Sequence, residues 1–345
     1  MQLGHEVTVA CGTSLDVETV YRYYRLSRYP RFLALGARRN SSFVERLALW
    51  GTRGRPALDR LAPDMILLNG ALPLTFRAPT CSVSHDLERR LQHLDLARVA
   101  YKRLAYSKTN FVVATCTELK AALSRELRID PAHVHLIPTC VNPSSYTQKP
   151  IWEREDAILH MGIADYKNPA GTIQSFSLLK HQSASLYITG TPNETVTSCV
   201  AALEPTVRRR IKLLGNVSSE TLKELLGRVK VVSVPSVYFV PVASPTVIES
   251  FASGTPVVGS PCITKDLLQD GHNGFVRQAH DCEERAVALD TLLEKQDLWR
   301  SMANSALATA QRFSAKTVAQ SYLELFKHGI PLTRTSDHFL AKPTA

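Results

Sequence analysis

Short apolar runs alternate with longer amphipathic stretches along most of this chain, and the alternation occurs twice. The predicted strands of the first half are Val7–Cys11, Met65–Leu68, Cys81–Ser84, Phe111–Ala114 and Val134–Ile137. Its clearest predicted helices are Leu87–Tyr106 and Glu118–Leu127. Strands that alternate with helices of about 10–15 residues are typical of parallel sheets, because two parallel strands need a long crossover connection. The first half therefore predicts an α/β domain.

The second half repeats the alternation more regularly. Its predicted strands are Ala157–Met161, Ser185–Thr189, Ile211–Leu214, Val229–Val234, Pro256–Val258 and Gly274–Val276. Its predicted helices are Pro169–Lys180, Ser218–Gly227, Pro245–Ser253, Glu283–Glu294, Leu298–Phe313 and Thr317–Phe326. Two such units in tandem predict two doubly wound parallel-sheet domains that face each other across a cleft, with additional C-terminal helices. Ligands of such sheets bind at the carboxyl ends of the strands.

A segment rich in proline and serine, Val141–Glu153, predicts a linker between the two units. We therefore predict an N-terminal domain over residues 1–149, a C-terminal domain over residues 150–328 and a tail over residues 329–345. The chain of 345 residues is long enough for each domain to bury a core of its own.

Positive charge is concentrated in the N-terminal half. The net charge is +10, and residues 22–60 alone contain ten arginines against two acidic residues, with aromatic residues such as Tyr23 and Trp50 interleaved. Such a stretch suits an anionic membrane surface or an anionic acceptor. A solvated helical face that covers apolar surface is an equal alternative. Nucleic acid ranks third and is not predicted as a partner, because no recognisable binding motif accompanies the charge.

Several classes of chemistry lack support in the sequence. There is no P-loop, no G-x-G-x-x-G after a strand, no H-E-x-x-H and no G-x-S-x-G. The seven cysteines contain no C-x-x-C pair and, with the histidines, form no zinc pattern, so we predict free thiols and no metal. No apolar run reaches the ~18 residues of a membrane span, and no signal peptide is visible. We expect a cytoplasmic protein. The basic stretch adds a second expectation, a peripheral position at the inner face of the membrane.

The most informative segment, Val229–Ser260, predicts a strand, a loop, a helix, a turn and a second strand. Ser244 suits the N-cap of this helix and Pro245 its first position, so free amides would face the predicted cleft, where a diphosphate could bind. Glu249 follows in the same helix and could accept hydrogen bonds from a ribose diol. On helix logic alone, an ordinary βαβ unit with an exposed glutamate is the favoured interpretation.

The run Glu249–Val258, preceded by Pro235-Ser236, resembles the donor-site signature of family 4 glycosyltransferases. Further segments resemble that family in order and spacing: Gly4–Val9, Ser84–Leu87, Ile137-Pro138, Val141-Asn142, His160–Gly162, Lys167–Pro169, Leu214–Val217 and Asp270–Phe275. The resemblance implies a GT-B fold and an enzyme that transfers a sugar, with retention, from a nucleotide-diphosphate donor to an acceptor. It implies a UDP- or GDP-linked sugar as substrate, a sugar or lipid-linked acceptor, and no cofactor or metal.

The same resemblance implies roles for individual residues. Glu249 would hold the donor ribose, Lys167 would neutralise the diphosphate, and His85 would lie near the transferred sugar. The other donor-binding residues would be Gly162 and Asn168 in the phosphate loop, Gly215 and Asn216 beside the base, and Ser244, Pro245, Thr246 and Val247 at the helix start. A lysine and a helix N-terminus can together stabilise a departing diphosphate.

Three departures from the family pattern bear on activity. The first glutamate of the usual pair is replaced by Pro241, and the basic residue that usually follows Gly162 is Ile163. The opening strand and its glycine loop do not precede Gly4, so we expect that roughly 15–20 residues were lost from the start. Two alternatives therefore stay open, namely a degenerate GT-B protein that binds without catalysis and a nucleotide-sugar epimerase.

Overall fold

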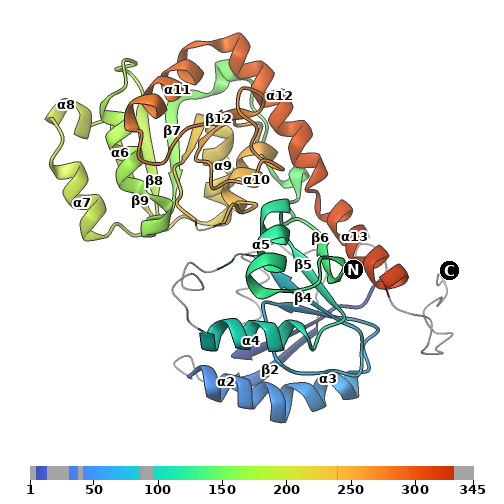
Figure 1. The fold of residues 1–345 in the computed structure, drawn as a ribbon. Coiled ribbons are helices and arrows are strands. Elements are labelled where there is room, and N and C mark those ends of the chain that lie inside the picture. The colour runs from blue at the N-terminus through green and yellow to red at the C-terminus, as the bar shows by residue number, and fades with distance from the viewer. Residues whose placement is uncertain are drawn as a thin grey trace. The chain divides into compact units, whose positions relative to one another are not determined.

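The computed structural model describes residues 5–13, 31–37, 42–85, 87, 96–238 and 240–329 (Figure 1). The chain divides into two compact units. The first comprises residues 1–84, 95–113 and 324–345, and the second comprises residues 85–94 and 114–323. The predicted domain ranges of 1–149 and 150–328 stay a prediction. This division assigns residues 85–94 and 114–149 to the second unit and residues 324–328 to the first.

The first unit begins with two parallel strands, β1 (Thr8–Thr13) and β2 (Arg31–Ala37), paired with Thr8 opposite Arg31. Strand β2 has no predicted counterpart, since it lies inside the arginine-rich stretch. The helical elements α2 (Phe43–Leu49), η1 (Trp50–Gly54) and α3 (Arg55–Leu61) follow. Helix α2 begins with a capping box, in which Ser42 Oγ accepts from the N–H of Glu45 at 3.2 Å and the Glu45 carboxylate accepts from the N–H of Ser42 at 2.6 Å.

Four further strands form a sheet in the order β3-β4-β5-β6. Their bounds are Ile66–Asn69, Thr80–Ser84, Phe111–Ala114 and Val134–Leu136, each within one residue of its prediction. Helix α4 is observed over Leu96–Tyr106, and residues 88–95 of the predicted helix lie outside the described residues. Helix α5 (Thr117–Leu127) belongs to the second unit. Its start contacts the loop at 264–266 of the same unit, where the Asp266 carboxylate accepts from the N–H of Thr117 at 2.8 Å.

The second unit is built around a six-stranded sheet in the order β12-β11-β10-β7-β8-β9. Its strands, in chain order, are Glu155–Met161, Ser185–Thr189, Ile211–Gly215, Val229–Val234, Val257–Gly259 and Gly274–Val276. All neighbouring pairs are parallel, as predicted. The fold class is therefore α/β with doubly wound parallel sheets.

Helices cover both faces of this sheet. The helices that follow β7 along the chain are α6 (Pro169–Ser177), α7 (Glu194–Ala201), α8 (Pro205–Arg208), α9 (Ser219–Arg228), α10 (Pro245–Ala252), α11 (Cys282–Glu294) and α12 (Gln296–Arg312). The last helix, α13 (Ala315–Gly329), leads away from this sheet, and its residues from 324 on belong to the first unit (Figure 1). Leu159 of β7 packs into the core formed with α9 and α10, whereas its neighbour Ile158 packs into the core formed with α6 and α11. Buried on both faces, the strands show the continuous apolar runs by which they were predicted.

Two differences from the predicted helices have local causes. Helix α6 ends at Ser177 rather than Lys180, because the Asp290 carboxylate accepts from the N–H groups of Lys180 and His181 at 2.9 and 3.1 Å and draws the chain away from helical geometry. Helices α7 and α8 have no predicted counterpart, and each begins next to a proline-containing turn whose polar composition masks helical periodicity.

Arg154 is a buried cation that ties several segments of the second unit together. Its guanidinium donates to five oxygens: Lys149 O at 2.8 Å, Leu226 O at 3.2 Å, Val229 O at 2.9 Å, Ser253 O at 2.7 Å and Thr255 Oγ1 at 2.8 Å. Two of these carbonyls lie at the C-terminal ends of α9 and α10, where the helix dipole favours a cation. The arginine thus satisfies helix ends that no water reaches.

We predict that Arg154→Met lowers the free energy of unfolding by about 3 kcal/mol, because several buried carbonyls lose their donors. Denaturant unfolding measures this loss. Arg300→Met is the matched control, since Arg300 stacks 5.9 Å from the ring of the exposed Trp152 and should cost at most about 0.5 kcal/mol. Equal losses in the two variants would contradict the assigned role of Arg154.

Candidate active site

The strand order of the second unit contains a topological switch point between β7 and β10. Strands β7, β8 and β9 lead to one edge of the sheet, and β10, β11 and β12 lead to the other. Ligands of open parallel sheets bind outside the carboxyl ends of the strands at such a point. The loops at 162–168 and 235–244, which follow β7 and β10, carry most of the predicted donor ligands together with α10, which begins where the second loop ends.

These two loops are joined directly to each other. The N–H of Val237 donates to the carbonyl of Tyr166 at 2.6 Å. The rings of Tyr166 and Tyr238 pack at a tilt, with centroids 5.2 Å apart. Residues predicted from two distant sequence motifs therefore lie in one continuous surface of the second unit.

Gly162 and Lys167 form a compact turn directly after β7. Gly162 has a φ of +84°, which favours glycine, and its N–H donates to the carbonyl of Thr189 at 3.0 Å. Lys167 Nζ donates to the carbonyl of Met161 at 2.9 Å. A Cβ on Gly162 would lie 2.9 Å from that Nζ, so the lysine occupies the space that glycine leaves open. Burial lowers the pKa of Lys167, while attraction to Glu249 opposes this shift.

Asn168 connects this turn to α6. Its φ of +54° lies in the left-handed region, which asparagine tolerates better than most residues. Its Oδ1 accepts from the N–H of Gly171 at 3.0 Å and caps the helix. Its Nδ2 donates to the carbonyl of Ala279 at 3.0 Å. Both polar ends of the amide therefore hold the loop in place.

Glu249 extends from α10 and is mostly buried. Its carboxylate accepts a hydrogen bond from the hydroxyl of Tyr146 at 3.2 Å. Burial raises the pKa of Glu249, and Tyr146, Lys167 and Lys223 counteract the shift. The predicted residues Glu249 and Lys167 thus lie close enough for each to influence the ionisation of the other.

The sequence motifs do not indicate two further residues near Glu249, namely Tyr146 and Lys223. Tyr146 lies in the predicted linker, and its hydroxyl reaches a residue 103 positions away, so no local pattern indicates the contact. The Lys223 ammonium lies 5.3 Å from the centroid of the Tyr146 ring, in cation–π geometry. Tyr146 therefore holds the Glu249 carboxylate by a hydrogen bond, and Lys223 of α9 adds a positive charge nearby.

The start of α10 is placed as predicted, but its capping differs. Ser244 occupies the N-cap position with extended backbone, yet its side chain makes no capping hydrogen bond. Its carbonyl instead accepts from the N–H of Val247 at 3.1 Å, and the Val247 side chain belongs to the core. Pro245 has no N–H, and Thr246 lies in the first turn, where no acceptor within the helix exists. Thr246 thus offers an amide at this helix end.

Gly215 and Asn216 form the predicted base-binding turn after β9. Gly215 has a φ of +67°, and its carbonyl accepts from the N–H of Gly190 at 2.7 Å. Asn216 Nδ2 donates to Thr191 Oγ1 at 2.9 Å and is exposed. This turn therefore joins the ends of β8 and β9 next to an open surface.

His160 lies within β7, two residues before Gly162, and is fully buried. Its Nδ1 pairs with Thr172 Oγ1 at 2.9 Å, which in turn pairs with Ser233 Oγ at 2.9 Å. Burial, reinforced by the charge of Lys167, lowers the pKa of His160 to about 4. The residue is therefore neutral at pH 7 and supports the end of β7, from which the loop at 162–168 begins.

His85, the predicted residue of the N-terminal domain, directly follows β4 and is exposed. That position is the carboxyl end of a parallel strand, where ligands of such sheets bind. Its assignment next to the transferred sugar stays a prediction, as do the roles of the other site residues.

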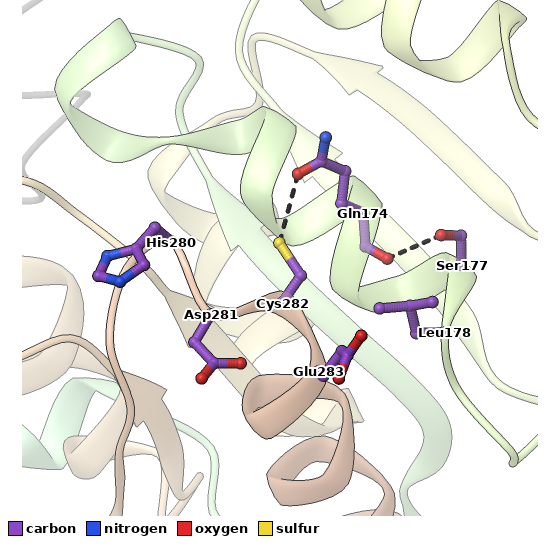
Figure 2. A pocket seen from close by; sticks show the side chains of 7 residues that line it. All are labelled: Gln174, Ser177, Leu178, His280, Asp281, Cys282 and Glu283. Carbon is purple, nitrogen blue, oxygen red and sulfur yellow. Dashed lines mark hydrogen bonds between the residues drawn. The ribbon is translucent and has the colours of Figure 1, made fainter.

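A surface hollow of about 520 Å³ lies between α6 and the start of α11 (Figure 2). Its lining consists of Gln174, Ser177, Leu178, His280, Asp281, Cys282 and Glu283, none of which is a predicted donor ligand. Among the described residues, no three His, Cys, Asp or Glu side chains gather as metal ligands would, and no helix is long and apolar enough to cross a bilayer.

Two family sequence models match the chain on either side of the predicted linker. The one described as Glycosyltransferase Family 4 matches residues 1–145, and the one described as Glycosyl transferases group 1 matches residues 155–295. No curated protein sequence matches the chain. The parallel sheets, the switch point and these two matches define a glycosyltransferase of the GT-B fold. The chain belongs to the family 4 glycosyltransferases.

Solved glycosyltransferase structures share the fold at low sequence identity. Anabaena Alr3699/HepE, in complex with UDP and glucose, is 17% identical with a TM-score of 0.71, over 93% of this chain and 91% of that one. A glycosyltransferase from Rickettsia africae is 16% identical with a TM-score of 0.72, over 95% and 91%. WaaG, a glycosyltransferase involved in lipopolysaccharide biosynthesis, is 13% identical with a TM-score of 0.67, over 95% and 92%.

The lowered pKa of His160 predicts a specific acid sensitivity. Between its ordinary pKa of about 6.5 and its folded pKa of about 4, only the unfolded chain takes up a proton at this site. The contribution of His160 to stability is thus fully present above pH 6.5 and is lost as the pH falls, in total by roughly 3 kcal/mol. Denaturant unfolding of wild type and His160→Gln over this pH range measures the difference. Parallel pH profiles would contradict the prediction.

Proposed function

We propose that this glycosyltransferase transfers a sugar, with retention of configuration, from a UDP-linked donor to a sugar or lipid-linked acceptor. The observation that carries the proposal is the proximity of Lys167 and Glu249 at the switch point. Lys167 lies in the loop after β7, and Glu249 lies in α10, which follows the loop after β10; the two loops hydrogen-bond to each other. The complex of HepE with UDP supports UDP over GDP as the nucleotide. The family assignment supports the transferase class over an epimerase.

The proposed mechanism uses charges that the chain itself supplies. The carboxylate of Glu249 accepts hydrogen bonds from the ribose diol, and the hydroxyl of Tyr146 keeps it oriented. Lys167 and the N-terminus of α10 stabilise the negative charge that develops on the leaving diphosphate. The bond between the anomeric carbon and the diphosphate breaks, and the acceptor oxygen bonds on the same face. The departing phosphate takes the acceptor's proton, so no metal is part of the proposal.

One observation favours a second candidate, a protein that binds the donor without catalysis. Pro241 occupies the position of the family's first glutamate, and its carbonyl accepts from Cys116 Sγ at 3.1 Å. The site therefore has no carboxylate at this point to contact the donor sugar. Release of UDP from UDP-sugars in the presence of acceptor decides between the two candidates.

We predict that Glu249→Gln weakens UDP binding about 10- to 30-fold, because an amide replaces the charged acceptor of the ribose hydroxyls. Isothermal titration calorimetry with UDP and GDP measures this. Glu204→Gln, at an exposed position before α8, is the control and should bind as wild type does.

The raised pKa of Glu249 predicts a pH dependence as well. The affinity of the wild-type chain for UDP should fall on acidification, and this fall should begin at a higher pH than for a glutamate with an ordinary pKa. A wild-type chain that binds neither nucleotide would sink the proposal.

We further propose that the first unit docks on an anionic membrane at the cytoplasmic face, which would present a lipid-linked acceptor. Exposed arginines follow one another along α2, η1 and α3, namely Arg46, Arg53, Arg55 and Arg60, with Val44 exposed beside them. Residues 22–30 and 38–41 of the predicted basic stretch lie outside the described residues. Arginines near an anionic surface each contribute about 1 kcal/mol, and apolar side chains add insertion.

Sedimentation with vesicles tests this docking. The wild-type chain should bind phosphatidylcholine vesicles that contain phosphatidylglycerol but not phosphatidylcholine alone, and added salt should release it. Changing the four arginines to glutamine should reduce binding by tenfold or more, on the order of their summed attraction. The control changes Arg208 and Arg209, which are exposed on and after α8, to glutamine and should have little effect. Binding to neutral vesicles at the same level would refute the docking proposal.

A further inference from the structure

Arg285 of α11 is a fully buried cation that the proposed mechanism does not use. Its Nη2 and Nε donate to Ser175 Oγ at 2.6 and 3.2 Å, and its guanidinium also donates to the carbonyls of Gly171 and Ala279. All of these acceptors are uncharged. The arginine therefore braces α6 against the start of α11 without neutralising its own charge.

Among the described residues, no carboxylate forms an ion pair with Arg285. Asp281, the N-cap of α11, attracts the charge of Arg285 without forming an ion pair with it. Its carboxylate instead caps the helix by accepting from the N–H of Glu284 at 2.9 Å. Arg285 lies in the first turn of α11 and touches the first turn of α6, so two positive helix ends surround it. Burying a cation in such a place is unfavourable unless an anion is nearby.

The position of Arg285 places this charge, which no ion pair among the described residues neutralises, behind the loop at 162–168. The carbonyl of Ala279 accepts from both Arg285 and Asn168, and Gly171, which Arg285 also contacts, donates to Asn168. From Gly171 to the start of α6 at Pro169 is only about 3 Å of helix rise. Both Lys167 and Arg285 act on the same histidine, because each lowers the pKa of His160.

The alternative place for an anion is the hollow between α6 and α11 (Figure 2). The carboxyl-bearing side chains of Asp281 and Glu283 line it, together with the neutral side chains of Gln174 and Cys282. Two carboxylates disfavour an anion there. The remaining direction is the loop at 162–168, where Ile163 stands in place of the basic residue that the family pattern would supply.

We propose that Arg285 is a positioning residue that supplies, from behind this loop, the second positive charge for the diphosphate of the donor. The inference rests on the proposed function, because the anion it serves is the UDP moiety. Arg285 acts without touching the ligand. It holds Asn168 and the first turn of α6 in place, and its charge adds to that of Lys167.

Comparison of UDP with uridine separates charge from structure. Arg285→Met should weaken UDP binding about tenfold and leave uridine binding unchanged, because only the diphosphate responds to the lost charge. Arg285→Lys keeps the charge and should restore most of the preference for UDP. Ser175→Ala removes a hydrogen-bond acceptor without changing charge and should keep the preference. Calorimetry measures UDP, ligand-observed NMR titration measures uridine, and thermal unfolding confirms that each variant is folded.

The outcomes distinguish the inference from the proposed function. If wild type binds neither UDP nor GDP, the proposed function fails and the inference falls with it. If wild type binds UDP but Arg285→Met loses UDP and uridine equally, or loses neither, only the inference is overturned. If the neutral variant does not fold, Arg285→Lys and Ser175→Ala decide: loss of the UDP preference in both shows that Arg285 acts as a structural brace only.

Discussion

The parallel pairing of β7 with β10 is the constraint on which the candidate site depends. Leu159 lies opposite Val232, and Ile158 lies opposite Val231, so each pair directs its side chains into the same one of the two cores. A slip of one residue would move every side chain of a strand to the opposite face, and both cores fix the register against it. With the register fixed, the two strands end level, and the loop that carries Lys167 meets the loop that leads into α10 and Glu249. The chemistry therefore depends on apolar packing that takes no part in it.

The buried cations of the second unit divide according to the helix ends they contact. Arg154 faces carbonyls at the C-terminal ends of α9 and α10, where the dipole and the charge attract each other, and its function is complete within the fold. Lys167 lies just before the N-terminal end of α6, and Arg285 lies in the first turn of α11, where the charge adds to a positive field. The first arrangement stabilises the protein, whereas the second is unfavourable for folding, and on the proposed function a bound anion offsets this cost. A buried cation at the C-terminal end of a helix thus indicates a structural role, and one at an N-terminal end is a candidate for a functional role.

The sequence predicts the second sheet well, because strands buried on both faces are continuous apolar runs with turns between them. It misses β2, since Arg31 and its neighbours outweigh the short apolar run Phe32–Leu35, and it misses α7 and α8, whose exposed faces blur the periodicity. In the candidate site, Lys167 and Glu249 are predicted because each lies within a short contiguous sequence motif. Tyr146 and Arg285 escape prediction because their contacts span 103 and 114 positions, and such contacts are determined by the fold. The uncapped Ser244 shows the converse, a local rule that tertiary packing overrides.

The departures from the family pattern are linked through packing. Ile163 packs against the core formed with α6 and α11, and its side chain fills the space beside Gly190, where a Cβ would lie 3.2 Å from it. A charged residue could not occupy that apolar position without losing its hydration. The proposed role of Arg285 therefore moves a positive charge from the rim of the loop to its interior. A buried charge is screened less by water and salt than one on the rim, so it attracts a diphosphate more strongly at equal distance. The apolar Ile163 thus excludes a charge at the rim of the loop, and on the proposed function Arg285 supplies that charge from the interior.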